Sequence, residues 1–450
     1  MSERNHVNNL KSVVSMAVLA LIVLPESALA STCMASSKTT MDSCMSGVVA
    51  GTYDSVEVTQ TFDCPTTGAD CSYLLRGLGS ASRPIEIYGS TPSVTIYRNP
   101  SVRTFRIEDS HNVTIRDLRL WERNKRNHNY QDCNFLRPDS APIVIDRNLA
   151  TGAGKSTSII LANISIDTGE PDAIQVGRAD NVNLLDSRIS GAGHFGLWTS
   201  NQFAKNTVRV FDNEFTGIGA NAILLANTKS AWINGNEMWN NHVSNPFCLP
   251  NGQHTGGGQM VVEQGVQNLT IQSNHIHSGG NAAVNGIEFA DGSGAPIKNV
   301  LLLANYIYGN PAGGVILNPV TPSHGVGGVS IRENVLYSNG ALQIRVNGHR
   351  DVDIWDNYYT QDLSLSPRAN FTGTPKTCSL GGQSTCSVNV TWSTQQASGV
   401  SVIVDGTGLF SSNSSGTSVA PWINSTGVVF EIFSTNTGAE PIARRFVKGL

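Results

Sequence analysis

The chain has 450 residues, of which 40% are hydrophobic and only 14% are charged, and it contains 44 glycines. This composition allows a large buried core and is typical of a β protein with many turns. The formal net charge of -4 gives no electrostatic basis for binding nucleic acid or an anionic membrane surface.

Residues 1–30 have the pattern of a secretory signal peptide. Arg4 and Lys11 precede an apolar run from 13 to 24, and Ala-Leu-Ala follows at 28 to 30, which predicts cleavage near Ser31. A membrane anchor is the alternative, but this run is too short to span a bilayer comfortably, and no other segment is long and apolar enough. We therefore expect a secreted or periplasmic protein without a membrane span in the mature chain.

Residues 31–101 are predicted to form an N-terminal cap and the first coils of a solenoid. The segment TTMDSCMSG indicates a short helix over the open end, followed by strands at VVAGTY and VEVTQTF. Such a cap is needed because the end of a solenoid exposes apolar side chains and unpaired strand edges.

The eight cysteines are an even number, as expected for disulfides in an exported protein. No CxxC or His/Cys cluster argues for zinc instead. Spacing alone does not prove the connectivity. It suggests three local pairs: Cys33 with Cys44, Cys64 with Cys71, and Cys378 with Cys386. The two remaining cysteines, Cys133 and Cys248, lie in long polar insertions and can join these insertions to each other.

Residues 102–362 contain one short phrase that returns repeatedly. Apolar and polar residues alternate, an Asn interrupts, and the alternation resumes, as in VRVFDNEF, LTIQSNHI and VDIWDNYY. A second alternating phrase, such as AIQVG or GIEFA, follows a few residues later. Alternation of period two predicts strands, so each repeat is one coil of three short strands separated by bends. The interrupting residues, predicted to bond the backbone of the next coil, are Asn213, Asn236, Asn274, Asn305, Asn334 and Asn357.

These repeats resemble the right-handed parallel β-helix of the pectate-lyase-like superfamily, over residues 84–362. The resemblance implies an all-β solenoid. It does not select an activity, because that superfamily includes polysaccharide lyases, glycoside hydrolases, uronan epimerases, phage spikes and non-catalytic surface proteins.

Outward-facing side chains of the second phrase should line up on successive coils. The first predicted column is Gln175, Trp198, Leu224, Val261, Glu288, Ile316 and Gln343. The second, two residues further along each strand, is Gly177, Ser200, Ala226, Glu263, Ala290, Asn318 and Arg345. A register error of one residue would invert both columns.

In this register Glu263 and Glu288 lie on neighbouring coils, with Cβ atoms about 8 Å apart. Carboxyl groups held about 6.5–9.5 Å apart suit an inverting glycosidase, in which a water molecule lies between the base and the sugar. Two solvated surface carboxylates are the alternative.

Asp172 and His194 precede the second phrase on adjacent coils. This arrangement resembles polygalacturonase-type hydrolases, in which an Asp pair and a Gly-His-Gly motif occupy successive turns. The resemblance implies that Asp172 is an acid catalyst tuned by His194. Pro171 stands in place of the first Asp, Phe195 follows the His, and no Arg-Ile-Lys signature follows. Capping of a bend by Asp172 and backbone bonding by His194 are the structural alternative.

Three further side chains are candidates for substrate binding. Trp198 and Trp232, if outward-facing, can stack on the apolar faces of pyranose rings, and Gln175 lies beside Trp198. The alternative is that the insertion carrying Cys248 covers the two tryptophans, so that they do not contact a ligand.

The repeat ends at Asp362, and residues 363–376 are predicted to be a linker. Residues 377–450 contain four alternating runs, SVNVTWST, VSVIVDG, TSVAPWI and VVFEIFS. They predict a small antiparallel β-sandwich, immunoglobulin-like in general form.

The function predicted from the sequence is that of a secreted polysaccharide-active enzyme, a hydrolase or lyase acting on a uronic-acid-containing or related glycan. A lyase needs a basic residue, for which Arg345 is the candidate, and often Ca²⁺ to neutralise the uronate. No calcium ligands can be located in the sequence. The alternative is a non-catalytic surface or carbohydrate-binding protein, which burial of Glu263 and Glu288 would favour.

Overall fold

The computed structural model describes residues 31–64, 71–98, 102–123, 141–147, 149–200, 202–242, 257–280, 284–290, 295–318, 326–340, 342–438 and 440–450. The predicted signal peptide, Cys133, Cys248 and most of the two long insertions lie outside these residues. Among the described residues, no helix is long and apolar enough to cross a membrane.

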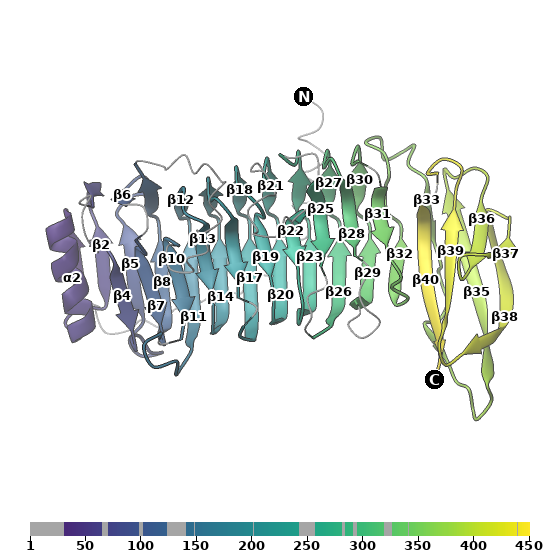
Figure 1. Cartoon of the computed structure of the whole chain (residues 1–450), viewed down its shortest axis with the longest axis horizontal. Helices are drawn as coiled ribbons and strands as arrows, with labels where there is room; N and C mark the ends of the chain where they lie inside the picture. Colours follow the sequence, from purple (N-terminus) through teal and green to yellow (C-terminus); the bar gives the residue numbers. More distant parts are fainter. Residues whose placement is uncertain are drawn as a thin grey trace, which may run out of the picture.

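The chain forms a right-handed parallel β-helix in which each coil adds one strand to each of three parallel sheets (Figure 1). This confirms the predicted coil of three strands. We name the sheets A, B and C in the order in which a coil visits them. Sheet A contains β1 (Thr32–Ala35), β2 (Ser55–Val58), β5 (Ile85–Gly89), β8 (His111–Arg116), β11 (Ser156–Ala162), β14 (Ala179–Leu185), β17 (Lys205–Phe211), β20 (Thr228–Asn234), β23 (Gln267–Gln272), β26 (Ile297–Leu303), β29 (Val326–Arg332) and β32 (Val352–Trp355).

Sheets B and C complete each coil. Sheet B contains β3 (Phe62–Asp63), β6 (Thr95–Arg98), β9 (Arg119–Glu122), β12 (Ser165–Asp167), β15 (Arg188–Ser190), β18 (Glu214–Thr216), β21 (Glu237–Trp239), β24 (His275–His277), β27 (Tyr306–Tyr308) and β30 (Val335–Tyr337). Sheet C contains β4 (Tyr73–Arg76), β7 (Phe105–Glu108), β10 (Ile143–Asp146), β13 (Asp172–Val176), β16 (Phe195–Thr199), β19 (Ile223–Leu225), β22 (Gly257–Val262), β25 (Val284–Phe289), β28 (Gly313–Leu317) and β31 (Leu342–Val346).

The core lies inside the solenoid, where equivalent apolar residues stack from coil to coil. In sheet A, for example, Val182 pairs with Val208 and Val208 with Ala231, and all three are buried. Because successive side chains of a strand point to opposite faces, this stack leaves the intervening residues for the outer surface. The period-two pattern of the sequence therefore specifies the inside and the outside of the solenoid.

The predicted Asn column forms a buried ladder at the bend between sheets A and B. The backbone N–H of Asn236 donates to Oδ1 of Asn274 at 3.0 Å, and the N–H of Asn274 donates to Oδ1 of Asn305 at 3.0 Å. Nδ2 of Asn274 also donates to the carbonyl of Ile233 on the preceding coil, at 2.9 Å. The predicted structural role is confirmed, because each side chain pairs backbone groups that a buried bend would otherwise leave unsatisfied.

A second, shorter ladder lies at the bend between sheets B and C. Asn241, Asn310 and Asn339 stand five residues after members of the first ladder, but Gly279 takes that position in one coil. Gln259, from sheet C, fills the gap: its Oε1 accepts from Asn241 at 3.0 Å, and its Nε2 donates to Oδ1 of Asn310 at 2.7 Å. A longer side chain from another sheet thus replaces the missing amide.

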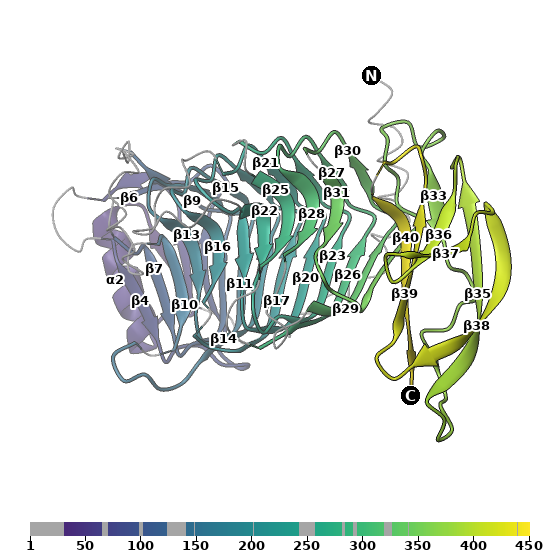
Figure 2. The same ribbon diagram turned by 45° about the vertical axis from the view of Figure 1, so that its right-hand side comes forward.

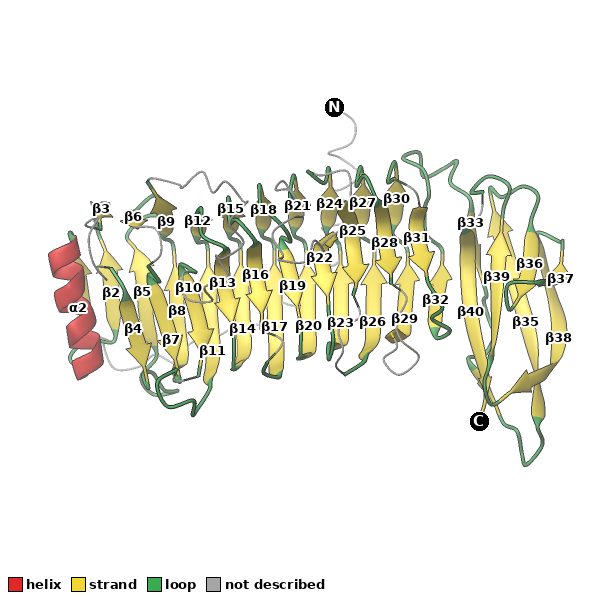
Figure 3. Cartoon of the chain, in the orientation of Figure 1, coloured by secondary structure: helices red, strands yellow, loops and turns green. Residues whose placement is uncertain are grey.

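Helix α2 (Lys38–Ala50) covers the first coil, as predicted (Figure 3). Ser37 begins the helix with a capping box, and Gly51 ends it with a φ of 83°. Met41, Cys44, Met45 and Val48 form its buried face. The predicted strand at VVAGTY is wrong, because the end of α2 and a turn occupy these residues.

Three disulfides join described residues: Cys33–Cys44, Cys64–Cys71 and Cys378–Cys386. They confirm the three predicted local pairs. The first ties β1 to α2, so it fastens the cap to the first coil.

The C-terminal part consists of two small layers of mostly antiparallel strands at the far end of the solenoid (Figure 2). The four predicted runs form β35, β36, β38 and β39, and the other four strands, β33, β34, β37 and β40, were not predicted from the sequence. One of them, β33, lies inside the predicted linker, where it pairs with β35. The strands are β33 (Arg368–Asn370), β34 (Thr377–Cys378), β35 (Thr385–Gln395), β36 (Ser401–Val404), β37 (Gly408–Ser411), β38 (Ser415–Asn424), β39 (Val428–Phe433) and β40 (Pro441–Gly449).

This C-terminal part contacts the last coil directly. Strand β40 pairs antiparallel with β32 through Ile354 and Arg444. The Glu440 carboxylate accepts from the N–H groups of Gln343 and Ile344, at 2.7 and 3.2 Å, on the last strand of sheet C. Exposed backbone groups at the end of the solenoid thereby find partners.

We predict that Asn274→Ala lowers the free energy of unfolding by about 3 kcal/mol, since it leaves buried backbone groups on two coils unpaired. The matched control is Asn206→Ala, because Asn206 is exposed and bonds only Asp180 among the described residues. This control should cost no more than about 0.5 kcal/mol in urea unfolding. Equal losses in both variants would contradict a special role for the ladder.

Candidate functional site

The outer face of sheet C carries the first predicted column in the predicted order from Gln175 to Ile316. Gln175 pairs with Trp198, Val261 with Glu288, and Glu288 with Ile316. The last coil is wrong by two residues, because Ile316 pairs with Arg345. Gln343 points inward instead and accepts a hydrogen bond from Nδ2 of Asn339 at 2.7 Å. The prediction that Gln343 faces outward is therefore wrong, because this amide belongs to the inner ladder.

Asp172 and His194 lie together on this face. Nδ1 of His194 is 3.6 Å from Oδ1 of Asp172, and Nε2 of Gln175 donates to Oδ2 of Asp172 at 2.8 Å. The Asp172 side chain is 7% exposed and that of His194 is 27% exposed. The sequence therefore located a pair in contact, and His194 is the member that solvent reaches more readily.

The backbone holds His194 in place. Strand β13 begins at Asp172, and β16 begins immediately after His194. The N–H of His194 donates to the carbonyl of Pro171 at 2.6 Å. The alternative of purely structural roles for Asp172 and His194 does not describe all their contacts. The N–H of His194 does bond backbone, but the His194 ring contacts the Asp172 carboxylate. Asp172 in turn accepts a hydrogen bond from the side chain of Gln175.

Aromatic rings adjoin the pair. The His194 ring lies 3.5 Å from that of Phe195, and Phe195 lies 6.2 Å from Trp198, measured between ring centroids. Trp198 is half-buried and packs against an apolar cluster of Phe195, Leu224, Ala226 and Val261. The cluster is buried although it lies on the outer face, so Trp198 offers only part of its ring to a ligand.

Glu263 and Glu288 form a second acidic centre on the same face. Glu263 lies two residues beyond Val261, which pairs with Glu288, as predicted. Burial and the Glu288 carboxylate raise the pKa of Glu263. Burial also raises the pKa of Glu288, while hydrogen bonds from Asn285 and Asn318 oppose this rise. Glu288 is only 7% exposed and Glu263 is half-buried, so the two side chains do not form the open carboxylate pair that an inverting hydrolase would need.

The two centres cannot act on one bond. His194 precedes β16 and Glu263 follows β22, two strand spacings away, which is about 10 Å along the solenoid axis. The register also places these two residues six positions apart along the strands, which is about 20 Å. The apolar cluster around Leu224 lies between them. Any single reaction must therefore use one centre or the other.

Trp232 and Arg345 lie away from both centres. Trp232 belongs to sheet A, is 38% exposed and stacks with Arg209, so it cannot share a surface with Trp198. Arg345 is exposed two coils from Glu288. In the part of the chain that the structure describes, no three His, Cys, Asp or Glu side chains are grouped to hold a metal ion.

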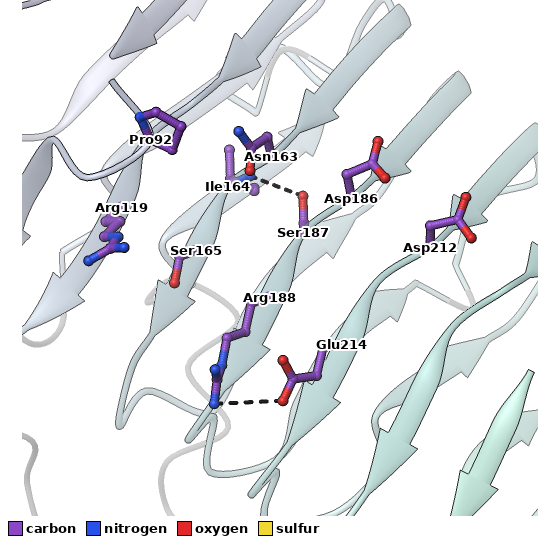
Figure 4. A pocket seen from close by; sticks show the side chains of 10 residues that line it. All are labelled: Pro92, Arg119, Asn163, Ile164, Ser165, Asp186, Ser187, Arg188, Asp212 and Glu214. Carbon is purple, nitrogen blue, oxygen red and sulfur yellow. Dashed lines mark hydrogen bonds and ion pairs between the residues drawn. The ribbon is translucent and has the colours of Figure 1, made fainter. Parts of the chain in front are cut away.

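Figure 4 shows a shallow groove at the bend between sheets A and B, with a volume of about 360 Å³. Arg119, Arg188 and Glu214 line it, and Arg188 pairs with Glu214 at 3.6 Å. No predicted site residue lines this groove, and apart from the half-buried Glu214 its charged side chains are exposed.

Asn285 and Asn318 were not predicted as functional residues, although Asn318 appeared in the second column. Their Nδ2 atoms donate to the two carboxylate oxygens of Glu288, at 3.0 and 2.5 Å. A signal for Asn285 existed, since it stands three residues before Glu288 as Asp172 stands three before Gln175. In both strands this spacing brings the two side chains together.

No protein-family model matches the sequence, and no curated protein matches it. Among solved structures, the A-module of mannuronan C-5 epimerase AlgE6 from Azotobacter vinelandii is similar, with a TM-score of 0.41 and 14% identity over 72% of this chain and 93% of that chain. The A-module of AlgE4 from the same organism has a TM-score of 0.39 and 14% identity, over 73% and 75%. An alginate lyase from Paenibacillus sp. str. FPU-7 has a TM-score of 0.36 and 9% identity, over 70% and 98%. The fold assignment rests on the strand pairing of this chain, not on these similarities.

We predict that Glu263→Gln raises the melting temperature at pH 8. A carboxyl whose pKa is higher in the folded than in the unfolded state destabilises the fold above both values, and this effect disappears below the ordinary pKa of about 4.3. The gain should therefore vanish near pH 3. Glu237→Gln, at a side chain that is 54% exposed on sheet B, is the control and should change little at either pH. A lower melting temperature for Glu263→Gln at pH 8 would contradict the assignment.

Proposed function

We propose that this protein is an extracytoplasmic enzyme acting on a uronic-acid-containing polysaccharide that lies along the outer face of sheet C. The observation that carries the proposal is the contact between Asp172 and His194 at 3.6 Å, on a face that also presents part of Trp198. Gln175 is buried beside them and holds Asp172. The three disulfides agree with an oxidising compartment outside the cytoplasm.

In this proposal His194 is the base and Asp172 orients it. Asp172 faces Nδ1, which leaves Nε2 as the nitrogen that accepts a proton. Contacts of this kind are often long until substrate binds, so 3.6 Å is compatible with the role. This reverses the roles that the polygalacturonase resemblance implies, because Asp172 is the more buried of the two.

An anionic glycan would meet positive charge at the first coils of the same face. Arg76 and Arg106 both donate to the Glu108 carboxylate, which leaves one net positive charge on this cluster. Burial of Glu108 would raise the pKa of its carboxyl group, but the hydrogen bonds from the Arg76 and Arg106 guanidinium groups outweigh this effect and lower the pKa. Arg106 lies two strands from Gln175, or about 10 Å along the solenoid axis.

Two reactions fit a base at this position. In hydrolysis, His194 would activate water and a second group would protonate the leaving oxygen. In β-elimination, His194 would remove the proton beside the uronate carboxylate, and a cation such as Ca²⁺ or an arginine would stabilise the resulting charge. The calcium requirement belongs to the second reaction alone.

The second candidate function is that of a non-catalytic carbohydrate-binding protein. The burial of Glu288 and its two amide hydrogen bonds favour it, because they give this carboxylate a structural role. In that case the C-terminal antiparallel strands, for which we propose an immunoglobulin-like arrangement, would attach the solenoid to a surface.

We predict that His194→Ala reduces turnover of the active glycan at least about 100-fold, as expected for loss of a general base. The assay incubates the protein with a panel of neutral and uronate-containing glycans and follows reducing ends, absorbance of unsaturated products and the proton spectrum of the polymer. Reducing ends alone indicate hydrolysis, unsaturation indicates β-elimination, and a changed spectrum without cleavage indicates epimerisation.

The control is His275→Gln, which alters a histidine on sheet B and should retain full turnover. No change in any glycan with the wild-type chain would favour the binding protein. Full activity of His194→Ala would contradict the role given to His194.

A further inference from the structure

A buried ion pair lies near the Asp172–His194 pair without touching it. Nη1 of Arg98, at the end of β6, is 3.0 Å from Oε2 of Glu122, at the end of β9. Their side chains are 1% and 0% exposed. Buried ion pairs are seldom more stabilising than apolar residues of the same size, so stability alone does not account for this one.

The ion pair fixes the segment that leads into the site. Oε2 of Glu122 accepts hydrogen bonds from Oγ1 of Thr168 at 2.9 Å and from the N–H of Gly169 at 3.0 Å. Arg98 also donates to Oγ1 of Thr168 at 2.9 Å, and the N–H of Glu170 donates to the same oxygen at 3.1 Å. Thr168 is fully buried, and its hydroxyl thus joins both ionised groups to the backbone before Asp172.

The same segment holds the partner residue. The carbonyl of Glu170 accepts from the N–H of Gly193 at 2.7 Å, and the carbonyl of Pro171 accepts from the N–H groups of His194 and Phe195. The carboxylate of Asp172 and the backbone of His194 are therefore both placed by residues 168–172. A shift of this segment would change the 3.6 Å contact directly.

We propose that Arg98 and Glu122 are positioning residues, which set the geometry of the Asp172–His194 pair through Thr168 and Gly169. The planar guanidinium suits this task because it reaches Glu122, Thr168 and the carbonyl of Val102 at once. The catalytic consequence rests on the proposed function, whereas the structural consequence does not.

The test uses the full chain and three variants, Glu122→Gln, Arg98→Lys and Thr168→Val. The first readout is the imidazole signal of His194 in a ¹H–¹³C spectrum of histidine-labelled protein, assigned with His194→Gln. We expect this signal to move in all three variants while the signal of His275 stays in place. Thr168→Ser, which keeps the hydroxyl, should restore the wild-type position.

The second readout is kinetic, on the glycan that the panel identifies. We expect kcat to fall about 100-fold with KM within about twofold, since misplacement of a catalytic group by about 1 Å has an effect of this size. Glu431→Gln is the matched control, because it removes the charge from another largely buried ion pair, with Arg444 at 3.1 Å in the C-terminal part. It should leave both the His194 signal and kcat unchanged.

The outcomes separate the two proposals. A lower melting temperature with an unmoved His194 signal would overturn the positioning role, because the ion pair would then serve stability alone. Movement of the signal in the Glu431→Gln control would overturn it as well. An inactive wild-type chain would refute the proposed function, whereas the His194 signal would still decide the positioning role.

Discussion

The structure depends on satisfying backbone hydrogen-bonding groups at the bends of a stacked chain. Strands pair between coils without help from side chains, but a sharp bend buried in the stack leaves N–H and carbonyl groups unpaired. The Asn ladder supplies one amide to each coil from Asn213 to Asn357, and each of these side chains bonds backbone groups of the preceding coil. The coils are thereby held in register, and every surface column on sheet C inherits this register.

The sequence predicted the solenoid because its two signals are local and repeated. Alternation identified the strands, and Asn213 to Asn357 marked one bend. The second ladder carried a similar signal at a spacing of five residues, but Gly279 interrupts it. The replacement by Gln259 comes from a different sheet, so no local pattern reveals it. The error at Gln343 has the same origin, since a buried amide and a surface amide look alike in sequence.

The candidate site was predictable in part for similar reasons. The strand register predicted that Asp172 lies next to His194 and Glu263 near Glu288, because the register follows from the period of the repeat alone. Burial was not predictable, since the exposure of Glu288 depends on Asn285 and Asn318. Glu263 and Glu288 therefore differ in solvent exposure, which the spacing of residues in the sequence does not encode. The structure places Trp198 on sheet C, in the predicted column, and Trp232 on sheet A, so the two tryptophans cannot bind one ligand together.

The contacts at the last coil have a consequence for how the molecule behaves in a crowded compartment. An open parallel stack is a template on which another stack could grow, in the way that amyloid fibrils elongate. Here β40 occupies the end of sheet A, Glu440 accepts from the end of sheet C, and Tyr358 bridges to Val335 at the end of sheet B. With α2 over the opposite end, the chain itself covers the first coil and the last strands of sheets A and C, so a second molecule finds few free strand edges on which to add.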